Sequence, residues 1–160
     1  MKVSLHWLRR FVDFDLSATE LADKLTMRGF ESEVVTDFED LENLVVGKVL
    51  TADKHPDADK LKLCTVSDGS NTFNVVCGAP NVDAGQKIVF AQVGAILPGD
   101  FKIGKAKIRG VESFGMICSE RELGISEEHD GIMVLDDSFK AGTPVKEVLG
   151  PIFNAIDIEV

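Results

Sequence analysis

The chain has 160 residues, of which 44% are hydrophobic and 28% charged, and its formal net charge is −10 at pH 7. This length suits one medium domain or one domain with a small companion, and no apolar run reaches the ~20 residues of a membrane span. The acidic balance excludes a protein that coats nucleic acid without selectivity, because such proteins are basic overall. The start lacks the apolar run of a signal peptide, so we expect a cytoplasmic protein without a membrane partner.

The cysteines and histidines indicate neither a disulfide framework nor a metal site. The three cysteines are Cys64, Cys77 and Cys118, and the three histidines are His6, His55 and His129. The cysteine count is odd and the spacings are long, which favours reduced, half-buried thiols. Zinc sites use close pairs such as C-x-x-C, and this chain has none. We therefore predict no metal ligands.

The N-terminal part of the chain predicts two short helices and a strand. Residues 4–12 carry apolar side chains at helical spacing. A second helix begins with a capping box from Ser17 to Glu20 and ends at Gly29. Residues 31–35 are extended in pattern. These elements are too few to bury a core alone, so they predict a cap or a docking element.

The middle of the chain is typical of β structure. The expected strands cover residues 45–50, 60–66, 72–77 and 88–93. The second and third form a hairpin around residues 67–71, and a turn-rich stretch at 53–59 separates the first two. Short strands at this spacing, with little helix between them, predict a small barrel.

A basic strip follows, on a chain that is otherwise acidic. Between Phe101 and Gly110 there are four basic side chains and no acid: Lys102, Lys105, Lys107 and Arg109. The apolar residues Phe101 and Ile103 have the opposite parity to Ala106 and Ile108. A bulge or strand break at Gly104 would bring all four to one side and turn the basic side chains to the other.

The strip has two interpretations. It is either an ordinary solvated strand edge blunted by lysines, or a face for an anionic partner. The residues that follow favour RNA, because Gly110 and Gly115 allow close backbone approach while Ser113 offers a hydroxyl and Met116 a deformable apolar contact.

The C-terminal part predicts several small elements. A capping box at 119–122 opens a one-turn helix that ends at Gly124. Residues 132–135 are extended, and a short helix runs from 143 to 150. Residues 155–160 alternate like a strand that has no obvious partner, so we expect a truncated chain.

No catalytic constellation is present in the sequence. It contains no phosphate-binding glycine loop, no dinucleotide fingerprint and no nucleophile elbow. The acidic stretch at 55–60 fits a proline turn whose aspartates bind nearby amides. We therefore predict no catalytic residues.

Several motifs resemble a known family in combination. Residues 55–61 (HPDADKL), 77–81 (CGAPN) and 107–116 (KIRGVESFGM) resemble the tRNA-binding OB-fold. Residues 25–31, 97–103, 118–126 and 129–132 are similar to the N-terminus of bacterial phenylalanyl-tRNA synthetase beta subunits. Together these motifs cover essentially the whole chain.

The resemblance implies an α+β, mainly β fold: a five-stranded OB-fold barrel preceded by a small N-terminal α/β cap. The implied ranges are 1–38 for the cap, 39–149 for the tRNA-binding OB-fold domain and 150–160 for the start of the next, truncated domain. The implied RNA-binding residues are Lys60, Lys102, Lys105, Lys107, Arg109, Ser113 and Met116. The expected role is a non-catalytic tRNA-binding module.

The resemblance also implies partners. These are tRNA, the synthetase alpha subunit and the rest of the beta subunit in a heterotetramer, with no DNA. No cofactor is expected in this segment, whereas the full ligase would use ATP and magnesium. Two alternatives stay open: a structural domain that docks on the rest of the synthetase, and a free-standing tRNA-binding protein that acts like a chaperone.

Overall fold

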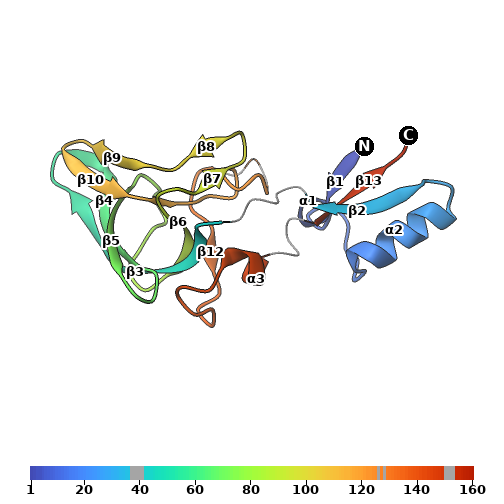
Figure 1. Ribbon diagram of the computed structural model, residues 1–160, viewed down its shortest axis with the longest axis horizontal. Coiled ribbons are helices and arrows are strands. Elements are labelled where there is room, and N and C mark those ends of the chain that lie inside the picture. The colour runs from blue at the N-terminus through green and yellow to red at the C-terminus, as the bar shows by residue number, and fades with distance from the viewer. Residues whose placement is uncertain (37–41, 126, 128, 150–153) are drawn as a thin grey trace.

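The computed structural model describes residues 1–36, 42–125, 127, 129–149 and 154–160. Figure 1 shows two parts: a β-rich body formed by the described residues from 42 to 149, and a small lobe formed by the first 36 residues together with the last strand. Within the part of the chain that is described, no helix is both long enough and apolar enough to cross a bilayer.

The small lobe is built on a three-stranded antiparallel sheet. Its elements are β1 (Lys2–Ser4), α1 (Leu5–Leu8), α2 (Ala18–Met27), β2 (Ser32–Thr36) and β13 (Asn154–Ile158). The strand order is β1-β13-β2, so the last strand of the chain is the central one. The chain ends therefore lie next to each other (Figure 1).

The pairing of β13 corrects the expectation that this strand has no partner. Ile156 is opposite Val3 on one side and Val34 on the other. Its side chain is 2% exposed and packs in a small core with Leu5 and Ala22. The partners were missed because they lie at the other end of the sequence, where local patterns give no information about pairing.

The second predicted helix is confirmed, with its start and its stop. The Ser17 N–H donates to the Glu20 carboxylate at 2.8 Å, and the Glu20 N–H donates to the Ser17 hydroxyl at 3.2 Å. These hydrogen bonds lower the pKa of Glu20. Gly29 has a φ of 94°, the left-handed conformation that ends many helices.

The first predicted helix is much shorter than the expected 4–12. Ser4 caps it by accepting the Trp7 N–H at 3.4 Å, but regular helix stops at Leu8. Phe11 and Val12, which the helical pattern placed on a buried face, are 70% and 52% exposed. A helix gains most of its stability from packing an apolar face against a core, and these two side chains stay largely exposed.

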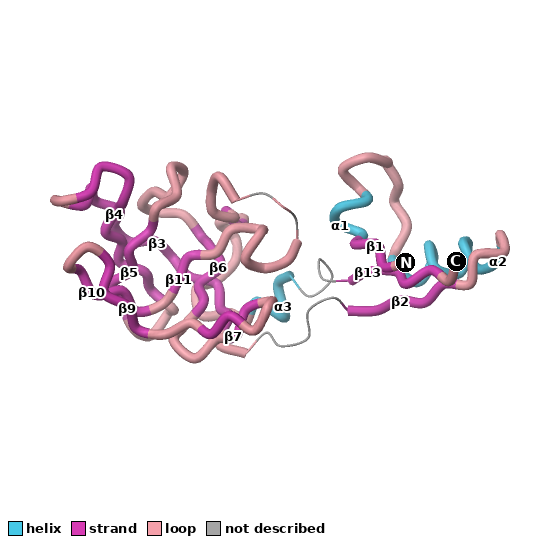
Figure 2. Tube along the Cα trace, turned by 90° about the horizontal axis from the view of Figure 1, so that it is seen from above, coloured by secondary structure: helices cyan, strands magenta, loops and turns pink. Residues whose placement is uncertain are grey.

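The body contains one large sheet and two small hairpins. The large sheet has β3 (Leu44–His55), β4 (Ala58–Ser67), β5 (Thr72–Cys77), β6 (Lys87–Ala91), β11 (Met116–Ile117) and β12 (Val134–Leu135). Its order is β11-β6-β3-β4-β5, with β12 also paired to β6. The hairpins are β7 (Ile96–Leu97) with β8 (Phe101–Lys102), and β9 (Lys105–Ile108) with β10 (Val111–Phe114). Figure 2 shows β6 and β7 near the short helix α3 (Val145–Leu149).

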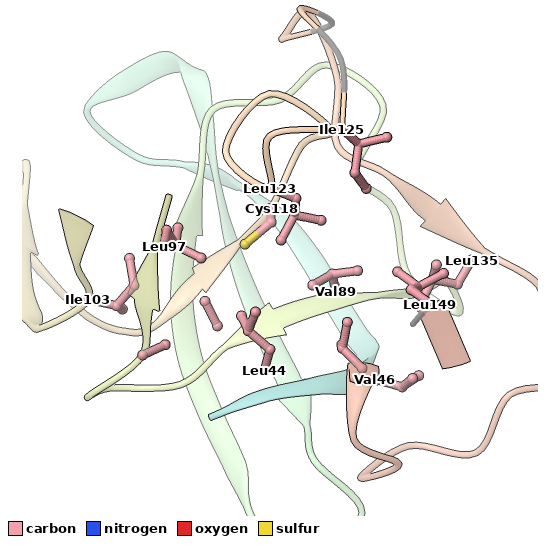
Figure 3. Close-up of a cluster of buried hydrophobic side chains, with 13 residues drawn as sticks. Leu44, Val46, Val89, Leu97, Ile103, Cys118, Leu123, Ile125, Leu135 and Leu149 are labelled. Carbon is pink, nitrogen blue, oxygen red and sulfur yellow. The ribbon is translucent and has the colours of Figure 1, made fainter. Parts of the chain in front are cut away.

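Strand β6 is buried on both faces. Val89 and Ala91 belong to one core cluster, whereas Ile88 and Phe90 belong to another, as the alternation of a strand requires. Figure 3 shows the first cluster, to which β3, β7 and α3 also contribute. The continuous apolar run at 88–91 is explained by this double burial.

Two further expectations need correction. Strand β3 continues to His55 and includes part of the stretch expected to be a turn. Residues 119–124 form a hydrogen-bonded turn rather than a helix, with the Gly124 N–H bound to the Arg121 carbonyl at 3.0 Å. The mainly β architecture is confirmed, and closure into a five-stranded barrel stays a prediction.

Candidate nucleic-acid interface

The basic strip is broken where the parity of its apolar residues changes. Regular strand ends at Lys102 and begins again at Lys105. Ile103 bonds instead to the chain before β7, donating its N–H to the Ala95 carbonyl and accepting the Gly94 N–H, both at 2.8 Å. The predicted strand break is confirmed.

The hairpin β9–β10 separates basic from apolar side chains. Residues directly opposite in an antiparallel pair lie on the same face, and successive residues alternate. One face carries the pairs Lys107–Glu112 and Lys105–Phe114, and the other carries Ala106–Ser113 and Ile108–Val111. Lys105 and Lys107 therefore share a face opposite to Ala106 and Ile108.

Glu112 interrupts the basic face. Its Oε1 lies 3.0 Å from the Lys105 Nζ, and both side chains are 55% exposed. Lys105 also sits over the Phe114 ring, 5.2 Å from its centroid. Sequence reasoning missed this acid because it follows the strip by a few residues and reaches the lysines only through the hairpin fold.

Arg109 occupies a strained position at the tip of this hairpin. Ile108 and Val111 are paired, so Arg109 and Gly110 form a two-residue turn, with φ values of 50° and 85°. Positive φ at both positions is the type I′ geometry, in which asparagine or glycine is preferred. An arginine there costs about 1–2 kcal/mol of backbone strain. Strain of this kind often marks a functional position.

A groove of about 600 Å³ lies beside the basic strip. The strip contributes Phe101 to Ala106 and Ile108 to its lining, and β5 with the residues after it forms another wall. All four apolar residues of the strip line this groove, but Lys102 and Lys105 line it too, so the predicted separation of basic from apolar side chains is incomplete. Ile103 is buried, whereas Phe101 and Ala106 are exposed. Met116 also lines the groove.

Ser113 does not offer its hydroxyl to solvent. Its side chain is 2% exposed, and its Oγ accepts the Val76 N–H at 3.0 Å and donates to the Gly115 carbonyl at 3.4 Å. The expectation of a hydroxyl presented to a ligand is therefore wrong in this structure. The hydroxyl instead fastens β10 to β5.

Gly115 also serves the fold. A Cβ built on Gly115 would lie 2.6 Å from the Phe90 ring and 2.7 Å from the Ala91 carbonyl oxygen. The backbone at Gly115 comes close to the core rather than to a ligand. Gly110, by contrast, has open space around it. Of the two glycines expected to allow close approach of a ligand, Gly110 at the hairpin tip still has the space for it.

Lys60 lies on β4, apart from the hairpin. Its side chain is exposed, and its carbonyl oxygen lies 4.0 Å from the point where a Cβ on Gly78 would stand. Gly78 lines the groove. Lys60 is therefore a neighbour of the groove wall, and its side chain is not part of the groove lining.

The described residues offer little for catalysis or metal binding. Nowhere among them do three or more His, Cys, Asp or Glu side chains gather in a way that could hold a metal ion. The three thiols are buried, and burial raises the pKa of Cys64 to about 11 and also raises those of Cys77 and Cys118. Thiols with such pKa values are poor nucleophiles near neutral pH.

Comparison with known families decides the classification. Residues 44–144 match the model of the family described as "Putative tRNA binding domain". The chain belongs to this tRNA-binding-domain family. The match covers β3 to the loop before α3 and so includes the groove and the basic hairpin.

Over nearly its whole length, the chain is similar to curated phenylalanine–tRNA ligase beta subunits. It is 53% identical to the phenylalanine–tRNA ligase beta subunit of Syntrophotalea carbinolica over 152 residues, covering 94% of this chain and 19% of that protein. The corresponding subunit of Hahella chejuensis is 50% identical over 161 residues, covering 100% of this chain and 20% of that protein. The chain thus spans about a fifth of these relatives.

Solved structures include more distant matches. The chain is similar to the crystal structure of a MetRS-related protein from Pyrococcus horikoshii, with a TM-score of 0.48 and 24% identity, covering 62% of this chain and 85% of that one.

Proposed function

We propose that this chain is a non-catalytic module that binds tRNA on behalf of a phenylalanine–tRNA ligase beta subunit. The observation that carries the proposal is the basic hairpin. Lys105 and Lys107 share one of its faces and Arg109 stands at its tip, on a chain whose net charge is −10. A local cationic face on an acidic protein attracts a polyanion at one place and leaves the rest of the surface repulsive.

The strain at Arg109 supports the same assignment. A turn residue selected for stability alone would be asparagine or glycine. Arginine places a guanidinium with several donors at the exposed tip of the hairpin, and this group matches phosphate geometry. We assign phosphate contacts to Lys102, Lys105, Lys107 and Arg109, with Lys60 and Met116 as neighbours of the bound strand.

A tRNA titration at two salt concentrations tests the proposal. With about three phosphates neutralised on unpaired RNA, the slope of log K against log salt is near −2, and affinity falls roughly twentyfold between 50 and 200 mM salt. Lys107→Ala flattens this slope by about 0.7, the share of one phosphate contact. The matched control is Lys146→Ala, an exposed lysine on α3. Absence of tRNA binding at the lowest salt would contradict the proposal.

Assembly with the rest of a longer subunit is the second candidate function. Its support is an exposed aromatic pair on the small lobe: the rings of Trp7 and Phe11 lie 4.8 Å apart, and the side chains are 46% and 70% exposed. Such a pair is typical of contact surfaces. On this reading, Trp7→Ala and Phe11→Ala impair association with the other synthetase parts and leave the tRNA affinity of this chain unchanged.

The wider architecture is part of the proposal. We assign residues 39–149 to an OB-type module, and the hydrogen bond between Ser113 and Val76 supports closure of its barrel between β10 and β5. The remaining parts of the beta subunit and an alpha subunit, in a cytoplasmic heterotetramer, would supply catalysis. We assign ATP and magnesium to those parts, as the similarity to ligase beta subunits implies.

A further inference from the structure

Phe101 is an aromatic side chain that lies outside the hydrophobic core of the body. It is 52% exposed, whereas Phe90 is fully buried. Among the described residues from 42 to 149, it is the one aromatic side chain that is largely exposed; the others, Phe73, Phe114 and Phe139, are partly buried. Isolated apolar residues on a surface are common, so its surroundings decide its meaning.

Phe101 lines two hollows. It lines the main groove and also a smaller hollow of about 370 Å³ shared with Leu97 and Pro98. Its cross-strand partner is Leu97, which is 2% exposed. The β7–β8 hairpin therefore anchors the residue, while the aromatic surface stays open to a ligand.

The groove beside Phe101 is lined by both apolar and charged residues. Ile103, Ala106 and Met116 contribute apolar surface, and Lys102 and Lys105 contribute positive charge. Glu122 and Asp130 also line it, so a bare anion is not favoured throughout the groove. This combination suits a ligand with one anionic group, a flat apolar face and polar edges.

We propose that the groove binds an unpaired nucleotide of RNA, with its base stacked on Phe101 and its phosphate near Lys102. The inference rests on the proposed tRNA-binding function and deepens it. Stacking on an aromatic ring is available to every base, because each has a π face, and it contributes substantially to single-strand binding.

This mode discriminates unpaired from paired RNA. In a duplex the base faces are stacked on each other and cannot reach a side chain, whereas loops and ends can splay their bases out. A basic hairpin without the aromatic site would bind both forms through phosphates. The site therefore directs this chain to loops or single-stranded ends.

The test compares three RNA probes with the 160-residue chain by fluorescence anisotropy: tRNA, a short unpaired RNA and the same RNA annealed to its complement. We expect the unpaired strand to bind and to compete with tRNA, and the duplex to bind about tenfold more weakly. Phe101→Ala weakens the unpaired strand about tenfold, the loss of one stacked base, without changing the salt slope. Phe101→Trp retains affinity and Phe101→Leu does not.

Phe30→Ala is the matched control, because Phe30 is also 52% exposed but lies on the small lobe. It keeps full affinity. If tRNA binds but Phe101→Ala or Phe101→Leu binds like the unmodified chain, the stacking site is wrong and the proposed function stands. If the chain binds none of the RNAs, the proposed function fails with it. Displacement of the RNA by an apolar peptide, with equal binding of duplex and single strand, would assign the groove to a protein partner.

Discussion

The Ser113 hydroxyl accepts the backbone N–H of Val76 at 3.0 Å and so joins β10 to β5, two strands that belong to different sheets. Ser113→Ala leaves this donor unpaired in a partly buried place, which costs about 1–3 kcal/mol. Chemical denaturation measures the loss. Ser70→Ala, an exposed turn serine, is the control and stays within about 0.5 kcal/mol of the unmodified chain. An unchanged denaturation midpoint for Ser113→Ala would show that the bond contributes nothing.

Glu112→Gln is predicted to strengthen tRNA binding. The carboxylate holds the Lys105 Nζ at 3.0 Å and offsets its charge. With the carboxylate removed, Lys105 can pair with a phosphate, so affinity rises and the salt slope becomes steeper by up to about 0.7. Titrations at two salt concentrations measure both. Glu147→Gln, on α3, removes the same charge away from the hairpin, and equal effects of the two variants would contradict a specific role for Glu112.

Arg109→Asn is predicted to separate stability from binding. Asparagine tolerates the φ of 50° that Arg109 adopts, so the variant relieves backbone strain and is more stable by about 1 kcal/mol. The same change removes one cationic group from the hairpin tip and weakens tRNA binding. Thermal melting and a tRNA titration of the same sample test both effects. A variant that is less stable, or that binds as tightly as before, would contradict the assignment.

The three thiols are predicted to be unreactive in the native protein. Burial raises the pKa of Cys64 to about 11, so this thiol is neutral near pH 8. Because the pKa of Cys64 is higher in the folded state, this thiol contributes stability below pH 9, the pKa of the unfolded thiol. The contribution is lost as the pH rises towards 11. We expect slow labelling by a thiol reagent at pH 8 and rapid labelling in denaturant. Rapid labelling without denaturant would contradict this burial.

Gly131→Ala is predicted to destabilise the body through Asn81. The Asn81 side chain accepts the Ile132 N–H at 2.8 Å and donates to the Ile132 carbonyl at 3.0 Å. A Cβ on Gly131 would lie 2.7–2.9 Å from the atoms of this amide. The clash costs about 1–3 kcal/mol in chemical denaturation. In the double variant Gly131→Ala with Asn81→Ala the clash is absent, so the loss of stability is smaller than the sum of the two single losses. A loss equal to that sum would contradict the contact between the two residues.

Local signals in the sequence were sufficient where neighbouring residues determine the structure. The capping box at Ser17 and Glu20 needs only residues within one helical turn, and the strand break at Gly104 follows from the parity of adjacent apolar residues. The basic side chains were likewise found from composition. These features are properties of short windows, which propensity and periodicity describe well.

Long-range relationships were not accessible in the same way. The sequence predicted that the Ser113 hydroxyl faces a ligand. This prediction failed because the hydroxyl is covered by β5, where its partner Val76 lies 37 residues earlier in the chain. Glu112 was not connected with Lys105 because the ion pair requires the register of the β9–β10 hairpin. The length of the first helix depended on whether Phe11 finds a packing surface, and tertiary context decided against it.

The position of β13 has a consequence for the order in which the protein folds during synthesis. Thr36 pairs with Asn154, which lies 118 positions further along the chain. During synthesis, β1 and β2 therefore have no central strand to pair with until the body has been made. At ribosomal rates of 5–20 residues per second, this interval lasts roughly 6–24 s. The body can fold as a unit within that time, whereas the small sheet is completed only after β13 has been made. Until β13 is made, the edges of β1 and β2 that will pair with it stay unpaired, and unpaired strand edges of this kind are prone to aggregation.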